Sequence, residues 1–345
     1  MAHVFTEEQL LATATAIFQA TGAPPAEAAA VAGHLVTASV MGYDTHGVIR
    51  IPQYVGDAKR GAIIPGAPVR VERETATTAV VDGGWNFGQV AGLRAMEIAI
   101  AKAKSGGIAM VVTHRSNHAG RLGAYTQQAA EAGFLALAFC NSPPQGHFVL
   151  PWGGTQARLA TNPISFAIPS SGGFPVLADF ATAETTEGAL RLYRNLNKPL
   201  PAGWILDAKG QPSTSAADFY GPPKGSILPF GGPRGYRGFA LSLLVEIMSG
   251  LLGGSPTVKD QAGNGLAFIA IDPGAFLTPE QFDALMQELR EYVKSSPPAP
   301  GSSEVLLPGE PEAKRVEERR KNGIPLDDNT WEQIRQAAAS VGIEI

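Results

Sequence analysis

The chain is organised around the stretch Gly42-Tyr43-Asp44-Thr45-His46-Gly47-Val48-Ile49-Arg50, which follows an Ala-rich helical segment. His46 and Arg50 are four residues apart, so a helical turn here would place both side chains on one face. Arginine supplies a fixed fork of donors that can bind a carboxylate at two points. Histidine titrates near neutral pH and can exchange a proton with the atom beside that carboxylate. The stretch therefore indicates a site for a small carboxylate substrate. A solvated helix end with a surface histidine and arginine is the alternative that the local pattern leaves open.

Composition indicates a compact protein with a substantial core. The 345 residues are 44% hydrophobic and 17% charged, a length that leaves room for two or three domains. The net charge of −4 argues against nucleic acid as the main partner, since a phosphate-binding surface usually carries a basic excess. Cys140 is the single cysteine, which excludes an internal disulfide and a zinc cluster built on cysteines. It ends an apolar run, where a buried and unreactive thiol is expected.

The sequence shows no targeting or membrane segment. Its first residues lack a basic region followed by a long apolar core, which a signal peptide would need. No stretch reaches the roughly 18 uninterrupted apolar residues of a membrane span. We therefore expect a cytoplasmic protein without a membrane partner.

Helical and strand-like patterns are distributed unevenly along the chain. A capping box from Thr6 to Gln9 predicts a first helix, and Pro25 with Glu27 begins a second that ends near Met41. Further helices are predicted at 90–105, 123–132, 239–252, 278–293 and 314–321, and strands at 69–81, 108–112, 134–140, 160–169, 176–180 and 266–272. Short strand-like runs and Gly/Pro turns dominate from about residue 140 to residue 275.

Glycine-rich motifs give only a weak indication of a cofactor site. The chain has no G-x-G-x-x-G after a strand and no G-x-x-x-x-G-K-[ST], so the usual nucleotide-binding loops are absent. The stretch from Gly231 to Gly238 contains Arg234 and Arg237 and opens a helix whose N-terminus would favour an anion. An ordinary Gly-rich helix entry explains this pattern equally well.

Two further histidines lie in polar, Gly-adjacent contexts. His114 and His118 are four residues apart, which on a helix would match a zinc pair. The first has no glutamate beside it and no third ligand is evident, so we expect no metal site. For His118 we favour a general acid or base role, or a hydrogen bond to a cofactor. A metal-dependent site on His46, His114 and His118 stays as the rival interpretation.

Several segments together resemble the malate/L-lactate dehydrogenases of the non-Rossmann kind, a family that includes ureidoglycolate, sulfolactate and diketogulonate oxidoreductases and the Δ1-piperideine-2-carboxylate/pyrroline-2-carboxylate reductases. Each segment alone is modest, but their order and spacing span nearly the whole chain. They are the focal stretch with Pro52-Gln53-Tyr54, Ser116 to Gly120, Asn141-Ser142, Pro151 to Gly154, Thr161-Asn162-Pro163, Asp179 to Thr182, Gly231 to Gly238 and Pro308 to Pro311.

The resemblance implies an α/β (α+β) fold distinct from the Rossmann fold. A mostly antiparallel sheet domain, expected at 116–284, would bind NAD or NADP. A helix-rich dimerisation and substrate domain would be formed by both termini, at 1–115 plus 285–345, with 45–75 as a small connecting segment. The active site would lie near the interface of a homodimer or a larger homo-oligomer.

The resemblance also implies roles for individual residues. His46 would be the proton donor, tuned by the hydroxyl of Thr45, Arg50 would hold the substrate carboxylate, and His118 would lie beside the nicotinamide and the substrate. The residues implied to line the cofactor are His118, Gly120, Asn141, Ser142, Asp179, Phe180, Ala181, Glu187, Gly188, Arg234, Gly235, Gly309, Glu310 and Pro311.

The sequence departs from the family pattern in three places. Thr45 stands where serine is usual, which keeps the hydroxyl but adds a methyl group that crowds the relay. Ala189 stands where reductases of this type often carry an acid that completes a Ser-His-Asp relay. Arg234 replaces a more usual lysine and keeps its charge. The first two departures weaken the match to the cyclic-imine reductases.

We therefore predict an NAD(P)-dependent oxidoreductase that transfers a hydride between the nicotinamide and the α-carbon of a small 2-oxo or 2-hydroxy acid of the malate or lactate type. A cyclic 2-imino acid, piperideine- or pyrroline-2-carboxylate, is the alternative substrate. Alternatives of another class are a metal-dependent hydrolase or lyase and a relative that has kept the fold but lost activity. The sequence leaves the exact substrate and the choice between NADH and NADPH open.

Overall fold

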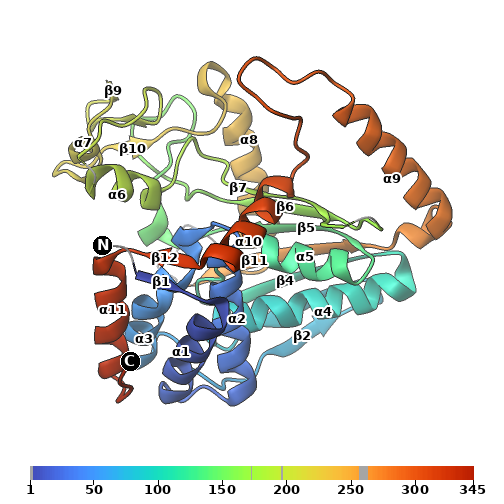
Figure 1. The fold of residues 1–345 in the computed structure, drawn as a ribbon, viewed down its shortest axis with the longest axis horizontal. Coiled ribbons are helices and arrows are strands. Elements are labelled where there is room, and N and C mark those ends of the chain that lie inside the picture. Colours follow the sequence, from blue (N-terminus) through green and yellow to red (C-terminus); the bar gives the residue numbers. More distant parts are fainter. Residues whose placement is uncertain (1–2, 172, 196, 256–262) are drawn as a thin grey trace.

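The computed structural model describes residues 3–171, 173–195, 197–255 and 263–345, and its centre is a large sheet (Figure 1). In order across the sheet, the strands are β2 (Arg70–Glu74), β3 (Thr78–Asp82), β4 (Ile108–Ser116), β11 (Asn264–Ile271), β5 (Leu135–Cys140), β6 (Ile164–Ile168) and β7 (Val176–Phe180). β3 and β4 run parallel, and the other neighbouring pairs run antiparallel. A mixed α/β fold with a mostly antiparallel sheet, as expected, is confirmed.

The central strand β11 buries both of its faces, because its side chains alternate between two apolar clusters. Leu266, Phe268 and Ala270 pack with α4 (Gly88–Gly106) and α5 (Gly123–Glu131), whereas Ala267 and Ile269 pack with the helix formed by α8 (Tyr236–Val245) and η5 (Glu246–Leu251). The thiol of Cys140 is buried beside this strand, and desolvation raises its pKa to about 12. The expected buried thiol is confirmed.

A helical layer on one side of the sheet is built from both ends of the chain (Figure 1). Its elements are α1 (Glu7–Ala20), α2 (Pro25–Val40), α3 (Ile51–Lys59), α10 (Glu310–Asn322) and α11 (Asp328–Ala339). The two ends are joined by an antiparallel pair, β1 (His3–Phe5) with β12 (Ile324–Leu326). Thr6 forms the expected capping box at the start of α1. Among the helices described, none is long and apolar enough to span a membrane.

A smaller region is formed mainly by the chain between β7 and α8, and its own apolar core also includes Val149 and Leu159. It contains α6 (Glu187–Asn195), β8 (Ile205–Leu206), β9 (Pro212–Ser213), α7 (Ala216–Tyr220) and β10 (Ser226–Ile227). β8 pairs antiparallel with both β9 and β10. Figure 1 shows α6 at the edge of this region that faces the helical layer.

The sheet takes strands from both sides of the domain boundary expected at residues 115 and 116. β2, β3 and β4 precede that boundary and yet pair into the same sheet as β11 and β5. The division of the chain into domains stays a prediction, and these strands favour a boundary before β2. Beyond the sheet, α9 (Pro279–Lys294) extends away from the body of the molecule (Figure 1).

We predict that Phe268→Ala lowers the free energy of unfolding by about 3–5 kcal/mol, because it removes a ring from the centre of the sheet and leaves a cavity. Phe268 is 0% exposed and lies edge-on to Tyr125 with ring centroids 5.2 Å apart. The matched control is Phe276→Ala, since Phe276 is 66% exposed. Urea unfolding should separate the two variants, and equal midpoints would contradict this account of the core.

Candidate active site

The focal stretch folds as two 3₁₀ turns, η1 (Asp44–His46) and η2 (Val48–Arg50), on either side of an extended Gly47 with φ −89° and ψ −152°. A side chain at Gly47 would collide with Ser39 Oγ of α2. The same oxygen accepts a hydrogen bond from the Val48 amide at 3.1 Å. From the spacing alone, we considered a single helical turn across this stretch. The structure has two 3₁₀ turns instead, because the close contact between Gly47 and α2 interrupts the helix.

The stretch is also fixed from the C-terminal half of the chain. Arg319 of α10 donates from Nη2 to Asp44 Oδ2 at 2.9 Å and also binds the carbonyl of Ser39. Tyr43 donates to Glu312 of α10 at 2.9 Å. The position of His46 therefore depends on residues nearly 270 positions away in the sequence.

Two histidines from distant segments stack in the site. The rings of His46 and His118 lie with centroids 5.6 Å apart and an interplanar angle of 12°. His118 Nδ1 lies 2.7 Å from the Tyr54 hydroxyl, which accepts a hydrogen bond from Gln89 Nε2 at 2.8 Å. The Gly120 amide also donates to His118 Nδ1, at 3.3 Å. Because these neighbours make Nδ1 an acceptor, the network assigns the proton of the neutral ring to Nε2.

Thr45 sits between His46 and helix α6. Its Oγ1 lies 3.1 Å from His46 Nδ1, so the hydroxyl expected to tune the imidazole is beside it. Its methyl group points to Gly188, where an added Cβ would lie 2.9 Å from Thr45 Cγ2. The extra methyl of threonine is therefore accommodated by the glycine rather than by displacement of the hydroxyl.

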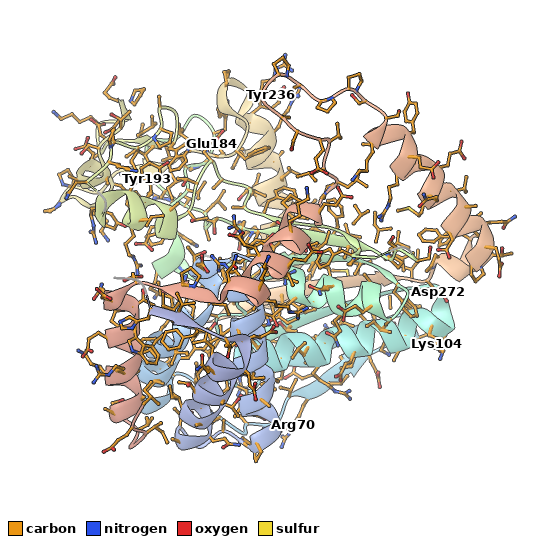
Figure 2. The ribbon with its side chains drawn as sticks, in the orientation of Figure 1. Arg70, Lys104, Glu184, Tyr193, Tyr236 and Asp272 are labelled. Atoms are coloured by element: carbon orange, nitrogen blue, oxygen red, sulfur yellow. The ribbon has the colours of Figure 1, made fainter. Side chains whose placement is uncertain are left out.

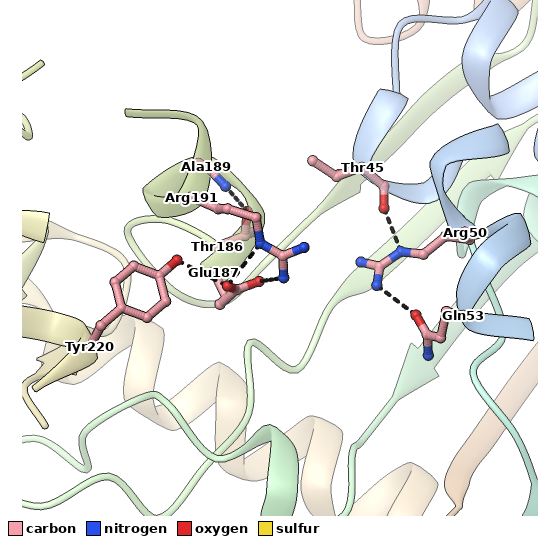
Figure 3. Close-up of polar contacts among 8 residues, drawn as sticks. All are labelled: Thr45, Arg50, Gln53, Thr186, Glu187, Ala189, Arg191 and Tyr220. Carbon is pink, nitrogen blue, oxygen red and sulfur yellow. Dashed lines mark hydrogen bonds and ion pairs between the residues drawn. The ribbon is translucent and has the colours of Figure 1, made fainter. Parts of the chain in front are cut away.

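Arg50 is oriented by its neighbours and keeps a free edge (Figure 3). Its Nε donates to the Thr45 carbonyl at 2.7 Å, and its Nη1 donates to Gln53 Oε1 at 2.9 Å. Among the residues that the structure describes, no acceptor bonds to its Nη2. A guanidinium held in this way presents a preformed donor to an anion.

The surroundings of both histidines favour the neutral ring. Desolvation, with the positive charges of Arg50 and Arg121 acting in the same direction, lowers the pKa of His46 to about 4. Desolvation also lowers the pKa of His118 well below its usual value, with Arg50 and His46 adding to the effect. No carboxylate contributes to either shift, so an anion bound at Arg50 would raise both pKa values.

Arg121 is a buried cation beside the stacked histidines, only 2% exposed. Its guanidinium lies over the Tyr43 ring, 5.2 Å from the centroid, and donates from Nη2 to Gln127 at 3.1 Å. Its Nε and Nη1 have no partner among the described residues. Asp179 of β7 accepts a hydrogen bond from the Gly123 amide at 2.6 Å and lowers the cost of burying the Arg121 charge. A buried donor without an acceptor is costly, which makes Arg121 a candidate for binding an anionic group.

The residues expected to line the cofactor fall into four groups. In the first group, Glu187 and Gly188 lie on α6 beside Thr45, and Gly120 packs against His34 and Gln89. In the second group, Asp179 lies near Arg121, and the exposed Phe180 and then Ala181 follow it along the chain. The remaining two groups are Asn141 with Ser142, and the segments around Arg234 and Gly309. The structure thus brings the first two groups close to His46 or Arg121.

Asn141 and Ser142 are engaged in the framework of the sheet. Asn141 is 1% exposed, donates from Nδ2 to Glu246 at 2.8 Å and accepts from the Gly265 amide at 2.8 Å. The Ser142 hydroxyl accepts a hydrogen bond from Asn264 at 3.1 Å. The Asn141 side chain therefore joins β5, β11 and η5, and its contact with the cofactor stays a prediction.

Loop amides near Arg234 are already bound by a side chain of the protein. Glu184, labelled in Figure 2, accepts a hydrogen bond from the Gly231 amide at 2.8 Å and another from Gly232. Gly235 packs on the Trp152 ring, where an added Cβ would lie 2.7 Å away. The first two amides of this loop are thus occupied by a carboxylate, which weakens the indication of a phosphate site.

The segment from Gly309 to Pro311 begins α10. Gly309 has φ +95° and lies against Phe174 and the Pro175 carbonyl, so a side chain there would be both strained and obstructed. Glu310 pairs with Lys294 at 2.8 Å and accepts from the Leu307 amide at 2.9 Å. This segment links α9 to α10.

The three histidines of the alternative metal site do not form a cluster. His114 lies on β4, where its Nε2 pairs with Glu72 of β2 at 2.9 Å, rather than on the helix that a zinc pair would need. Among the described residues, no group of three or more His, Cys, Asp or Glu side chains could hold a metal ion.

Sequence reasoning missed Gln89, Arg121 and Arg191 as members of the site. Gln89 and Arg121 lie far from the focal stretch in the sequence and reach it only through tertiary packing. Arg191 lies on α6, whose Arg-rich face has the pattern of an ordinary solvated helix. No local signal distinguishes these three residues from surface or framework residues.

The sequence matches the family model of malate/L-lactate dehydrogenases over residues 5–335. Hydroxycarboxylate dehydrogenase B of Escherichia coli (strain K12) is 35% identical over 349 aligned positions, which cover 99% of this chain and 95% of the relative. L-sulfolactate dehydrogenase of Methanocaldococcus jannaschii is 34% identical over 332 positions, which cover 94% of this chain and 93% of that protein.

Solved structures are similar over the whole chain. Malate dehydrogenase from Entamoeba histolytica superposes with a TM-score of 0.94 at 28% identity, covering 100% of this chain and 99% of that one. Δ1-piperideine-2-carboxylate reductase from Pseudomonas syringae pvar. tomato superposes with a TM-score of 0.83 at 29% identity, covering 97% and 100%.

We predict that the His46 ring titrates near pH 4 and that Arg50→Gln moves this midpoint upward, because it removes a positive charge that opposes protonation. NMR titration of histidine-labelled protein measures both values. The control Arg94→Gln removes a charge from an exposed pair with Glu97 and should leave the midpoint unchanged. A wild-type midpoint near 6.5 would contradict this description of the site.

Proposed function

The chain belongs to the malate/L-lactate dehydrogenase family, whose members are oxidoreductases of small 2-hydroxy acids, and we propose that His46, Arg50 and His118 carry this reaction here. The observation that supports the assignment is the stacking of the two imidazoles beside a guanidinium with a free edge. NADH or NADPH, when bound, supplies the hydride that reaches the α-carbon of the 2-oxo acid.

The residues present fit a nicotinamide dinucleotide at this site. Buried Arg121 has two donors that need an acceptor, and a phosphate would supply one. Arg121 and His118 would therefore hold the cofactor beside the substrate. The other residues implied by the family resemblance, among them Asp179, Arg234 and Gly309 to Pro311, stay predictions for the cofactor site.

Arg50 binds the substrate carboxylate in this proposal. Its orientation is set by the Thr45 carbonyl and by Gln53, so little ordering remains when the substrate arrives. The bound carboxylate neutralises the charge of Arg50, which after desolvation is the next cause that lowers the pKa of His46. His46 therefore becomes a better proton donor only in the complex, when the substrate oxygen is beside it.

His46 exchanges the proton with the substrate oxygen. In reduction of a 2-oxo acid the protonated ring gives its proton to that oxygen, and in oxidation of a 2-hydroxy acid the neutral ring accepts it. Thr45 holds His46 Nδ1, and Tyr54 holds His118 Nδ1, so both rings keep their orientation. Both histidines are positioned by groups that do not themselves carry charge at neutral pH.

A cyclic 2-imino acid is a second candidate substrate, suggested by the structural similarity to a Δ1-piperideine-2-carboxylate reductase. Ala189 occupies the place of the acid that often completes the relay in such reductases. In the structure its amide donates to Oγ1 of Thr186, the residue before α6, at 3.3 Å. No carboxylate raises the pKa of His46, which favours the 2-oxo acid over the imine.

We propose that two copies of the chain associate through apolar helix faces. Leu244, Ile247 and Leu251 are exposed on α8 and η5, and α9 exposes Leu285 and Leu289. Exposed apolar residues gathered on helices are typical of an interface between subunits. A cytoplasmic location and the size of the assembly stay predictions from the sequence.

His46→Ala should lower kcat for reduction of a 2-oxo acid by about two to four orders of magnitude, the usual effect of removing a general acid. The assay follows oxidation of NADH and NADPH with oxaloacetate and pyruvate. His3→Ala is the matched control, because His3 lies on β1 and pairs with Asp328. Wild-type turnover in the His46→Ala protein would remove His46 from the mechanism.

Leu289→Asp should shift the protein from dimer to monomer, because it places a charge within an apolar interface. Light scattering coupled to gel filtration measures the mass of the wild type and of the variant. Leu11→Asp on α1 is the control, since Leu11 is exposed on the helical layer. A monomeric wild type would overturn the proposed association.

A further inference from the structure

A second guanidinium faces Arg50 from the other side of the site (Figure 3). It belongs to Arg191 of α6, the helix whose first turn packs against the focal stretch through Gly188 and Thr45. The positive charges of the two arginines act on each other, and this repulsion adds to desolvation in lowering the pKa of Arg50. The carboxylate of Glu187 offsets part of this repulsion, and the two guanidinium groups face each other across the site.

Glu187 holds Arg191 and bonds to only one edge of its guanidinium group. Its Nε donates to Glu187 Oε1 at 3.2 Å and its Nη2 donates to Glu187 Oε2 at 2.7 Å. Tyr220 of α7 donates to Glu187 Oε1 at 2.9 Å and fixes that carboxylate in turn. The Nη1 group of Arg191 has no acceptor among the residues described. Figure 3 shows this group turned toward Arg50.

The free edges of the two arginines define a place for a doubly charged ligand. Arg50 presents Nη2 and Arg191 presents Nη1, each from a guanidinium whose other nitrogens are bonded. An ordinary ion pair between neighbouring helical turns is weakly oriented and needs no third residue, whereas Tyr220 here adds a third contact. The arrangement therefore has the form of a binding residue with its supporting contacts.

Resting on the proposed function, we propose that Arg191 binds a second anionic group of the substrate, at the end opposite the carboxylate held by Arg50. The preferred substrates are then 2-oxo and 2-hydroxy acids with a terminal carboxylate or sulfonate, rather than acids with a single charge. Arg191 is 53% exposed on its side chain, so it can receive the far end of a substrate whose reacting end lies beside the partly buried His46.

The geometry also indicates why one carboxylate would not satisfy both arginines. Arg50 is anchored on η2 by the Thr45 carbonyl, next to the proton donor, whereas Arg191 comes from a helix of the smaller region. A substrate with one acid group would use Arg50 and leave the repulsion with Arg191 only partly relieved. A dianion relieves it from both ends.

The test compares Arg191→Gln and Arg191→Lys with the wild type on oxaloacetate, sulfopyruvate and pyruvate. In Arg191→Gln we expect kcat/KM for the two dianions to fall roughly 10- to 100-fold, mainly through KM, because a charge-assisted hydrogen bond to the far group is lost. The loss on pyruvate should be smaller by about tenfold or more. Arg191→Lys should recover part of the loss, since it keeps the charge but not the fork.

Arg194→Gln is the control, because it removes a positive charge from the same helix at a residue that lies over the Tyr220 ring, 4.1 Å from its centroid. Its selectivity should equal that of the wild type. A loss confined to oxaloacetate or to sulfopyruvate would support the inference and identify the second group as carboxylate or sulfonate.

Two results would overturn the inference while leaving the proposed function intact: equal losses on the dianions and on pyruvate, or no loss on any of them. A wild-type enzyme that reduces none of the three acids with either cofactor would instead overturn the proposed function, and the inference with it.

Discussion

The site depends on how closely the backbone of the focal stretch can approach its neighbours. Gly47 lies against Ser39 Oγ on one side, and Gly188 lies against the Thr45 methyl on the other. Neither position has room for a Cβ, so the stretch is held between α2 and α6 with little freedom to move. Because His46 and Arg50 lie on this stretch, backbone packing fixes the positions from which their side chains extend into the site.

Positive charge is distributed in the site so that binding an anion would supply acceptors to several donors and neutralise several positive charges at once. Arg121 keeps two donors, and Arg50 and Arg191 keep one nitrogen each, without an acceptor among the described residues, and the surroundings of the two histidines favour the neutral ring. The buried charge of Arg121, whose Nε and Nη1 have no partner among the described residues, reduces the stability of the free protein. Substrate and cofactor would therefore contribute both affinity and stability, since ligands that bind only the folded state shift the folding equilibrium.

The sequence predicted the elements whose signals are local. The capping box predicted at Thr6 begins a helix, the helix predicted from residue 278 begins with a capping box at Thr278, and the apolar run that ends at Cys140 is β5. The mostly antiparallel sheet came from resemblance to a family, because no single-strand pattern specifies that β11 pairs with both β4 and β5 across more than 120 residues. Tertiary packing decides such pairings, and local propensity carries no record of them.

The site shows the same division between local and distant information. His46, Thr45 and Arg50 form a recognisable motif, whereas Gln89, Arg121 and Arg191 acquire their positions from α4, the segment after β4, and α6. The break of the helix at Gly47 also depends on a side chain of α2. The residue types near the reacting atoms were therefore identifiable, but their supporting contacts required the three-dimensional structure.

The bond between Arg319 and Asp44 has a consequence for synthesis of the protein on the ribosome. A nascent chain that has emerged only as far as the end of the sheet already contains His46, Arg50, His118 and Arg191. It still lacks the α10 arginine that secures the first turn, and β1 still lacks its partner strand. Assembly of the proposed reactive groups thus waits until α10 has been synthesised, so a polypeptide released before α10 would carry every proposed catalytic side chain without their final arrangement.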